Sequence, residues 1–307
     1  MPTYTFHQLD VFTTKPLAGN PLAVFPDADG LDPATMQALA REMNLSETTF
    51  VTPSPIATKR VRFFTPTAEI PLAGHPTIGT WWLLGELGLL AGAPPDGTVT
   101  VTQETGRAVL PVDVTFRAGT PREVVMTQAR PEFGPVVDDV AALDAALGGD
   151  GATVAGGPRP QVVSTALPQM MIPIQSRPAL RALPSGGAGA ELSALLRRYG
   201  TDCAMCYAPV ESVSGGDLTV ACRMFAPGLG IPEDPATGSA AGALGAFLVR
   251  HAIVPIEHGA VSIQVQQGHE IDRPSRIRVE IEGTPRDITR VRVGGSAVRV
   301  ITGEVSL

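Results

Sequence analysis

The feature that most constrains the fold of this chain is an internal repeat. Two segments in opposite halves of the 307 residues share one pattern, Phe64–Thr80 and Phe225–Ser239. Both contain Phe-x-Pro followed by Ile-Pro, and a gap of two residues then matches His75-Pro76 with Asp234-Pro235. A chain of this length is also long enough for two domains of ordinary size. We therefore expect two halves with the same architecture.

The sequence around each copy of the repeat predicts the same elements in both halves. A strand precedes each copy, an apolar glycine-containing stretch of helical length follows it, and an amphipathic helix lies further upstream. The rest consists of short alternating or apolar strands punctuated by turn residues, for example Thr98–Gln103 and Arg290–Ile301. This pattern predicts an α+β fold in which a mostly antiparallel, barrel-like sheet wraps a central helix in each half. We place the halves at 1–118 and 119–307, and we allow for the last strand, about 291–307, to pack back onto the first half.

Charge and hydropathy exclude two classes of partner. The chain carries a formal net charge of -7 and has no Lys/Arg block, so its surface would repel phosphate backbones and anionic headgroups. The longest apolar stretch, Trp81–Leu90, contains Glu86 and is too short to span a bilayer. The first residues lack a secretion signal. We expect no nucleic-acid or membrane partner and a cytoplasmic location.

Cysteine and histidine spacing predicts neither a disulfide framework nor a metal site. Cys203 and Cys206 form a CxxC, but the surrounding segment Cys203–Val210 is typical of a buried strand. The five histidines include no close ligand pair, and no phosphate-binding glycine loop is present. We expect no metal and no nucleotide cofactor.

Polar residues at three places are the candidates for chemistry. His75-Pro76 and Asp234-Pro235 each stand at a predicted helix start, where backbone N–H groups and the helix dipole attract a carboxylate. The alternatives are an ordinary N-cap for Asp234 and a structural role for His75. Glu47 stands where the sequence enters an apolar strand, and a partly dry site would raise its pKa and suit it to proton transfer. The alternative for Glu47 is a solvated loop residue.

Several blocks of the sequence together resemble the signature of the PhzF-like phenazine-biosynthesis proteins. They occur in order over nearly the whole chain: Leu9–Phe12, Gly19–Val24, Asn44–Phe50, Phe64–Gly79, Glu233–Ala240 and Gln267–Ser275. The resemblance implies the diaminopimelate-epimerase fold, with the active site between its two halves. Racemases of that wider fold carry a thiol at both central-helix starts, and this chain has a cysteine at neither, so two-thiol racemisation is not available to it.

The same resemblance implies an activity and roles for particular residues. The expected reaction is an isomerisation, without metal or cofactor, that moves a proton on a small carboxylate-bearing and possibly ring-shaped, anthranilate-like substrate. Glu47 matches the family's proposed acid/base residue. The expected substrate-binding residues are Ser46, Gly74, His75, Asp234, Thr237, Gly238 and Ser239. The family likeness also implies a homodimer.

Two alternatives remain open from the sequence. A hydrolase would use Ser239, His75 and Asp234 as a triad, although Thr237-Gly-Ser-Ala-Ala241 lacks the second glycine of a nucleophile elbow. A binding or scaffold protein would keep the fold without turnover, because fold alone does not fix function.

Overall fold

The computed structural model describes residues 2–212 and 218–307 and divides the chain into two compact units. The first unit is Met1–Thr127 together with Gly294–Leu307, and the second is Gln128–Val293. We expected the two halves to divide after residue 118. In the structure this position lies in the turn of a hairpin, where Ala118 and Gly119 both have positive φ. The strands on either side of that turn, β7 (Val109–Arg117) and β8 (Thr120–Thr127), pair with each other and belong to the first unit.

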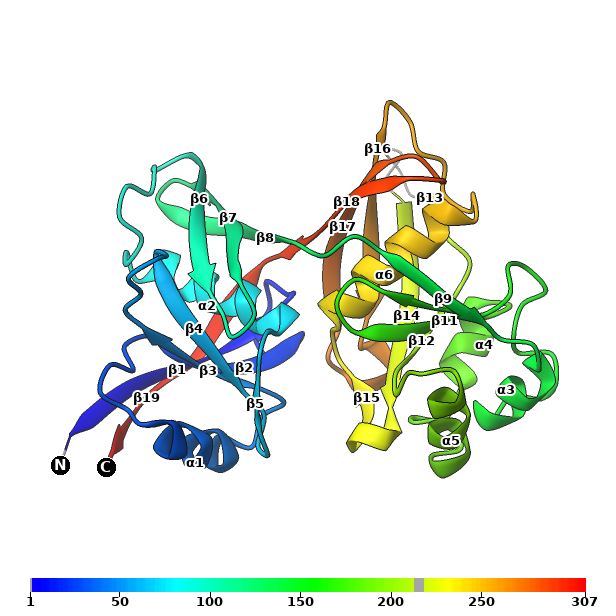
Figure 1. Ribbon diagram of the computed structural model, residues 1–307, viewed down its shortest axis with the longest axis horizontal. Coiled ribbons are helices and arrows are strands. Elements are labelled where there is room, and N and C mark those ends of the chain that lie inside the picture. Colours follow the sequence, from blue (N-terminus) through cyan, green and yellow to red (C-terminus); the bar gives the residue numbers. More distant parts are fainter. Residues whose placement is uncertain (1, 213–217) are drawn as a thin grey trace. The chain divides into compact units, whose positions relative to one another are not determined.

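The first unit is built on one continuous series of paired strands (Figure 1). The last strand of the chain, β19, pairs antiparallel with β1, and the series runs on through β2, β3, β4, β6, β7 and β8. Only β2–β3 and β4–β6 are parallel, and the short β5 forms a hairpin with β4. The bounds of the remaining strands are β1 Thr3–Val11, β2 Asn20–Phe25, β3 Thr48–Thr52, β4 Lys59–Phe64, β5 Glu69–Ile70, β6 Gly97–Glu104 and β19 Ala297–Ser306.

The second unit repeats this order of pairings. Its series runs β9, β10, β11, β12, β14, β16 and β17, with β11–β12 and β14–β16 parallel and β15 as the hairpin partner of β14. The strand bounds are β9 Glu132–Val136, β10 Gln161–Ser164, β11 Pro168–Pro173, β12 Ala204–Tyr207, β13 Glu211–Ser212, β14 Leu218–Ala226, β15 Ile231–Asp234, β16 Ala260–Gln267, β17 Ser275–Gly283 and β18 Ile288–Gly295. The predicted single strand Arg290–Ile301 is therefore two strands, β18 and β19, which separate at Ser296.

An arginine–glutamate pair marks the two copies of the repeat. In the first unit Arg62 on β4 forms a two-pronged ion pair with Glu69 on β5 and lies over the ring of Phe64. In the second, Arg223 on β14 pairs with Glu233 on β15 in the same way and lies over the ring of Phe225. The repeated sequence thus builds one hairpin twice.

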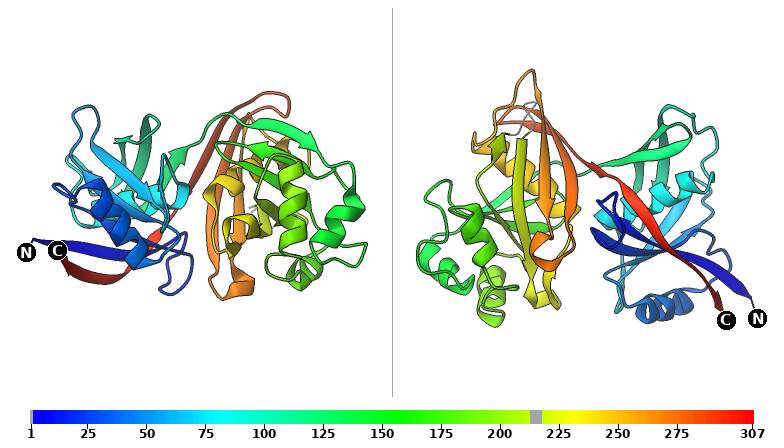
Figure 2. Two further views of the ribbon diagram at one scale, coloured as in Figure 1. Left: turned by 60° about the horizontal axis from the view of Figure 1, so that its bottom comes forward. Right: turned by 180° about the vertical axis from the view of Figure 1, so that it is seen from behind.

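A buried helix of 13 residues lies against the strands of each unit, and Figure 2 shows both helices from two further directions. α2 (Gly74–Glu86) is buried from His75 to Gly85 and contacts β1, β2, β3, β7, β8 and β19. α6 (Gly238–Arg250) is buried along almost its whole length and contacts β10, β11 and β17. A helix that is apolar on all sides must be covered on all sides, which explains why the strands surround it. The predicted α+β class, with a mostly antiparallel sheet around a central helix in each half, is confirmed.

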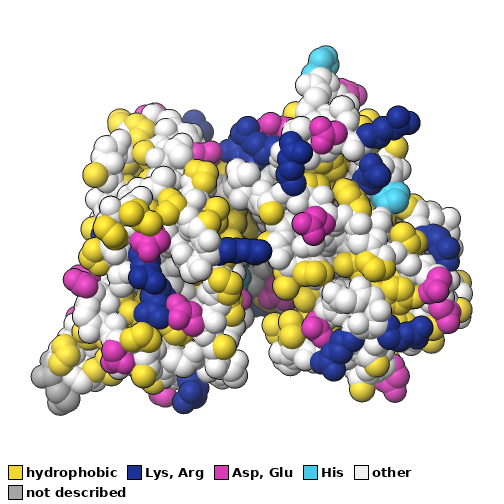
Figure 3. Space-filling model, viewed as in Figure 1, with side chains coloured by type: hydrophobic (Ala, Val, Ile, Leu, Met, Phe, Trp, Pro, Cys, Tyr) yellow, Lys and Arg dark blue, Asp and Glu magenta, His cyan; other side chains and the backbone are white. Residues whose placement is uncertain are grey.

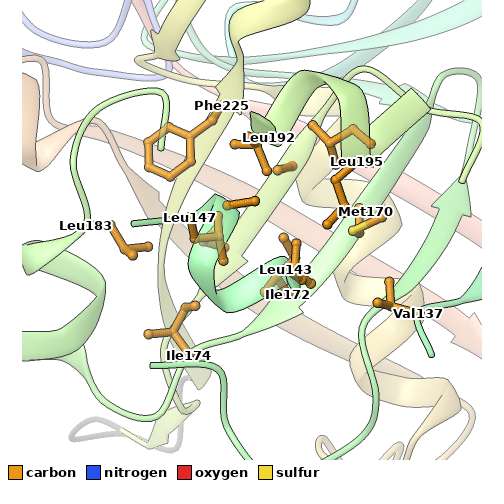
Figure 4. Close-up of a cluster of buried hydrophobic side chains, with 14 of the residues drawn as sticks. Val137, Leu143, Leu147, Met170, Ile172, Ile174, Leu183, Leu192, Leu195 and Phe225 are labelled. Carbon is orange, nitrogen blue, oxygen red and sulfur yellow. The ribbon is translucent and has the colours of Figure 1, made fainter. Parts of the chain in front are cut away.

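Smaller helices cover the outer side of each sheet. In the first unit α1 (Pro33–Met43), capped by Asp32, packs over Phe25, Phe50 and Phe64. In the second, α3 (Val140–Ala146), α4 (Arg177–Ala182) and α5 (Ala190–Arg198) enclose a larger cluster (Figure 4). The cluster contains buried side chains such as Leu143, Met170, Ile172, Leu192 and Phe225. One face of β11 therefore packs against these helices, and its other face packs against α6.

The three cysteines are buried and form no disulfide. Cys206 lies in β12, and Cys203 immediately precedes it, as predicted for a buried strand. Burial raises the pKa of both thiols to about 12. Because the thiolate is the reactive form of cysteine, neither group is activated near neutral pH.

Among the helices of the described residues, none combines the length and the apolar character needed to cross a membrane. On the face drawn in Figure 3, acidic and basic side chains are interspersed among apolar and uncharged ones. This mixture agrees with the modest net charge of -7.

Candidate active site

Glu47 lies at the end of the link from α1 to β3, directly before Thr48. The helix ends at Met43, and the C-cap residue Asn44 has a left-handed backbone conformation that turns the chain toward the strand. One carboxylate oxygen of Glu47, Oε2, is buried and has no hydrogen-bond partner within the described residues. Burial raises the pKa of Glu47, and a hydrogen bond from Ser46 opposes part of that shift. The structure favours the dry-site interpretation over the solvated loop, because Oε2 is buried and only 20% of the Glu47 side chain is exposed.

The structure brings His75 close to Glu47. Its Nε2 lies 3.5 Å from Glu47 Oε2, and only 7% of the His75 side chain is exposed. His75 is the second residue of α2, and the N-cap residue before the helix, Ala73, offers no side chain that could satisfy the first N–H groups. Ser46 directly precedes Glu47 in the chain, and its hydroxyl donates to Asn20 at 3.4 Å. Glu47 and His75, together with their chain neighbours Ser46 and Gly74, thus form one group in the first unit.

Asp234 does not stand at a helix start, contrary to the sequence prediction. It is the last residue of β15, and three residues separate it from Gly238, where α6 begins. The same number of residues separates β5 from α2 in the first unit. The structural counterparts of Gly74-His75 are therefore Gly238-Ser239. The sequence alignment erred because it matched the dipeptides His-Pro and Asp-Pro, which occupy different places in the two copies.

Asp234 nevertheless acts on the start of α6. Thr237 is the N-cap residue, but its side chain makes no capping bond, because its hydroxyl donates to Asp234 Oδ2 instead. Gln267 fixes this arrangement by donating to the Asp234 carbonyl at 2.6 Å and to Thr237 Oγ1 at 3.1 Å. A threonine would normally bond the helix's own N–H groups. Because the Thr237 hydroxyl bonds Asp234 instead, the N-terminus of α6 has no side-chain cap. The backbone N–H groups there can therefore bind an anion.

Three polar residues hold the first turn of α6 from the sheet side. Gln128 donates to the Gly238 carbonyl at 3.0 Å and accepts from Thr165 at 2.7 Å. Gln169 on β11 lies with its amide nitrogen 3.4 Å from Ser239 Oγ. Asp234, Thr237, Gly238 and Ser239 therefore form a second group, which belongs to the second unit together with its supporting glutamines.

The described residues contain no cluster of three or more His, Cys, Asp or Glu side chains arranged to hold a metal ion. The groups that are present can accept and donate protons at Glu47 and His75 and can bind an anion at the starts of α2 and α6. This chemistry suits acid/base catalysis on an anionic substrate.

Comparison with known proteins decides the family. The family model described as phenazine biosynthesis-like protein, PhzC-PhzF, matches residues 9–303. The chain belongs to this family. Its relatives are named as isomerases, and the chain is an isomerase of the PhzC-PhzF family. An uncharacterized isomerase of Clostridium acetobutylicum is 35% identical over 99% of this chain and 98% of its own length. The trans-2,3-dihydro-3-hydroxyanthranilate isomerase of Pseudomonas aeruginosa is 34% identical over 97% of this chain and 98% of its own length.

Solved structures agree with the fold of this PhzC-PhzF protein. The PhzF-family protein of Bacillus anthracis covers 100% of both chains with a TM-score of 0.89 and 26% identity. A structure described as a probable proline racemase of Agrobacterium radiobacter covers 99% of this chain and 93% of its own, with a TM-score of 0.64 at 14% identity. The second likeness concerns the fold alone.

Sequence reasoning missed the glutamines that surround the start of α6 in this PhzC-PhzF protein. Gln267 lay within a quoted family block but had no role assigned to it. Gln169 is the first residue of a run, Gln169–Ile174, whose pattern is typical of a short alternating or apolar strand. A polar residue inside such a run is a usable signal, because burying an amide is costly unless it has partners.

Proposed function

We propose that this isomerase moves a proton on a small carboxylate-bearing substrate, without a metal or an organic cofactor, and that Glu47 is the acid/base residue. The observation that carries the proposal is the state of the Glu47 carboxyl group. Its Oε2 is buried without a hydrogen-bond partner among the described residues, and burial raises its pKa. A carboxyl group of this kind can take a proton from a substrate carbon and return it to another near neutral pH.

His75 supports the same role for Glu47. At 3.5 Å its Nε2 is close enough to hold the carboxylate in place and to respond to its charge as the proton moves. We assign His75 and Ser46 to positioning, and Gly74 to binding the substrate's negative charge through the backbone at the start of α2. Proton return by the same group that removes the proton needs no further base, so one carboxylate accounts for both steps.

In the second unit we assign substrate binding to Asp234, Thr237, Gly238 and Ser239. The uncapped start of α6 favours an anion, and the Ser239 hydroxyl adds a donor to it. The hydrolase alternative has no specific support. Ser239 Oγ accepts a hydrogen bond from the Gln169 amide, and Asp234 accepts one from Thr237.

The test is solvent deuterium exchange combined with single-turnover kinetics on trans-2,3-dihydro-3-hydroxyanthranilate, the compound named for relatives of this chain. Glu47→Gln keeps the shape but removes the proton acceptor, so turnover should fall by about two to four orders of magnitude with binding retained. Ser239→Ala should weaken binding and rate together, because it removes a donor and leaves the base in place. Native-rate exchange in Glu47→Gln would show that another group moves the proton.

A further inference from the structure

Gln169 is a buried polar residue on the face of β11 that lies toward α6. Its neighbours in the strand, Met170 and Ile172, belong to the outer hydrophobic cluster. Because side chains alternate along a strand, Gln169 points the opposite way, and its amide nitrogen reaches Ser239 Oγ at 3.4 Å. None of its surface is exposed. The amide therefore lies against the first turn of α6, inside the second group of site residues.

The hydrogen bonding of Gln169 is incomplete, unlike that of the other two fully buried glutamines, Gln103 and Gln267. Gln103 accepts from the Trp81 indole at 2.6 Å and donates to Thr77 at 3.2 Å. Gln267 likewise uses both ends of its amide, on Asp234 and Thr237. By contrast, Oε1 of Gln169 is buried with no partner in the described part of the chain. A buried acceptor left unsatisfied costs stability, so the fold itself gives no reason for this amide.

The other unit shows what the fold requires at this position. The strand registers make Leu22 on β2 the counterpart of Gln169, because Ala23 pairs with the first residue of β3 as Met170 pairs with the first residue of β12. Leu22 is fully buried and packs so closely on α2 that a Cβ built at Gly79 would lie 2.6 Å from it. An apolar side chain thus meets the packing requirement of the architecture. The glutamine in the second unit serves something else.

We propose that Gln169 is a specificity-determining residue whose Oε1 accepts a hydrogen bond from the substrate held at the start of α6. The substrate class is then narrower than carboxylates in general: it carries an N–H or O–H donor beside the carboxylate. Gln169 Nε2 donates to Ser239 Oγ, which leaves the Ser239 hydroxyl hydrogen to bond the carboxylate. This inference rests on the proposed function, since it assumes that the start of α6 binds the substrate's anionic group.

The test compares two probes that differ only in the donor, anthranilate with an amino group beside its carboxylate and benzoate without one. Their dissociation constants are measured by isothermal titration calorimetry on the wild-type protein and on Gln169→Leu, which installs the residue that the first unit carries at the equivalent position. The wild type should bind anthranilate roughly tenfold more tightly than benzoate, the scale expected when a buried polar group is left unpaired. Gln169→Leu should bind both probes with nearly equal affinity, while its affinity for benzoate stays the same or rises.

The matched control is Gln103→Leu, the same change at a fully satisfied buried glutamine in the first unit. It should lower the melting temperature, because it removes partners from Trp81 and Thr77, but it should leave the anthranilate preference intact. Gln169→Leu should melt no lower than the wild type. A preference for anthranilate that survives in Gln169→Leu, or that is missing from the wild type, overturns the inference alone, and the Glu47→Gln exchange result still stands. If the wild type binds neither probe, the carboxylate assignment of the proposed function falls, and this inference falls with it.

Discussion

The hairpin that carries Asp234 depends on an ion pair whose loss can be predicted quantitatively. Arg223 and Glu233 have side chains only 3% and 2% exposed, and their closest nitrogen and oxygen atoms lie 2.6 Å apart. The Arg223 guanidinium also donates to the carbonyls of Leu180 and Leu183. Glu233→Gln leaves this guanidinium buried beside a neutral amide. Removing one partner of a buried pair typically costs about 3–5 kcal/mol.

The equivalent pair in the first unit supplies the control. Arg62 and Glu69 make the same two-pronged contact, but their side chains are 16% and 44% exposed. Water and salt therefore screen this pair, and Glu69→Gln should cost less than about 1 kcal/mol. Both substitutions remove one negative charge from an otherwise similar hairpin, so the difference between them isolates the effect of burial.

Differential scanning calorimetry measures both variants on the full chain. For a unit of this size, Glu233→Gln should lower the melting temperature by about 6–20 °C, whereas Glu69→Gln should lower it by no more than about 4 °C. Hydrogen–deuterium exchange should show the added opening at β15 and at the start of α6. Equal losses in the two variants, or a loss below about 1 kcal/mol for Glu233→Gln, would refute the reasoning from burial.

Four further predictions follow from the site, the core and the family. Burial raises the pKa of Glu47, so ionisation of this carboxyl group disfavours the folded state. Glu47→Gln should therefore match the wild type in unfolding free energy near pH 4 and should exceed it as the pH rises above 4.5, the ordinary pKa of a glutamate. Urea unfolding across this pH range measures the difference. Gly242→Ala would place a Cβ 1.9 Å from Gln128 Oε1, so it should displace that amide and lower substrate affinity. Its melting temperature should change by only a few degrees, because about 1 kcal/mol of gained helix propensity offsets the lost hydrogen bonds. The thiols should react with a disulfide reagent only after unfolding, because burial raises the pKa of Cys203 and Cys206 to about 12. The family likeness predicts a homodimer, and light scattering at micromolar concentration should give about twice the chain mass of 32.0 kDa.

The repeat could be detected in the sequence because some of its residues make the same contacts in both copies. Phe64 and Phe225 each receive an arginine side chain on their ring, so the aromatic residue recurs at the same place in each hairpin. The central helices were visible for a similar reason, since a helix covered on all sides must be apolar along its whole length. Packing requirements of this kind fix the residue types at regular positions, so they can be predicted from the sequence.

The sequence predictions were wrong or incomplete where a residue's role depends on its position in the three-dimensional structure. Asp234 resembled a helix cap because Asp-Pro is a common start signal, but its carboxylate bonds Thr237 from the end of a strand. Burial of Glu47 could not be read from its neighbours, because it depends on α2, whose residues lie more than twenty positions further along the chain. Gln169 was hidden for the same reason. Its significance depends on which face of β11 it occupies and on the leucine that replaces it in the other unit.

The pairing of β1 with β19 has a consequence for how the chain folds as it is made. β1 lies between β2 and β19, and its registers run from Thr3 to Val11 on one side and from His7 to Val11 on the other. β19 follows every other strand in the sequence, so the whole second unit emerges from the ribosome before β1 receives that partner. Until then one side of β1 is an unpaired edge of the kind that invites association with other chains. The second unit should therefore reach its native state first, and the first unit, which holds Glu47, should mature only when the final strand arrives.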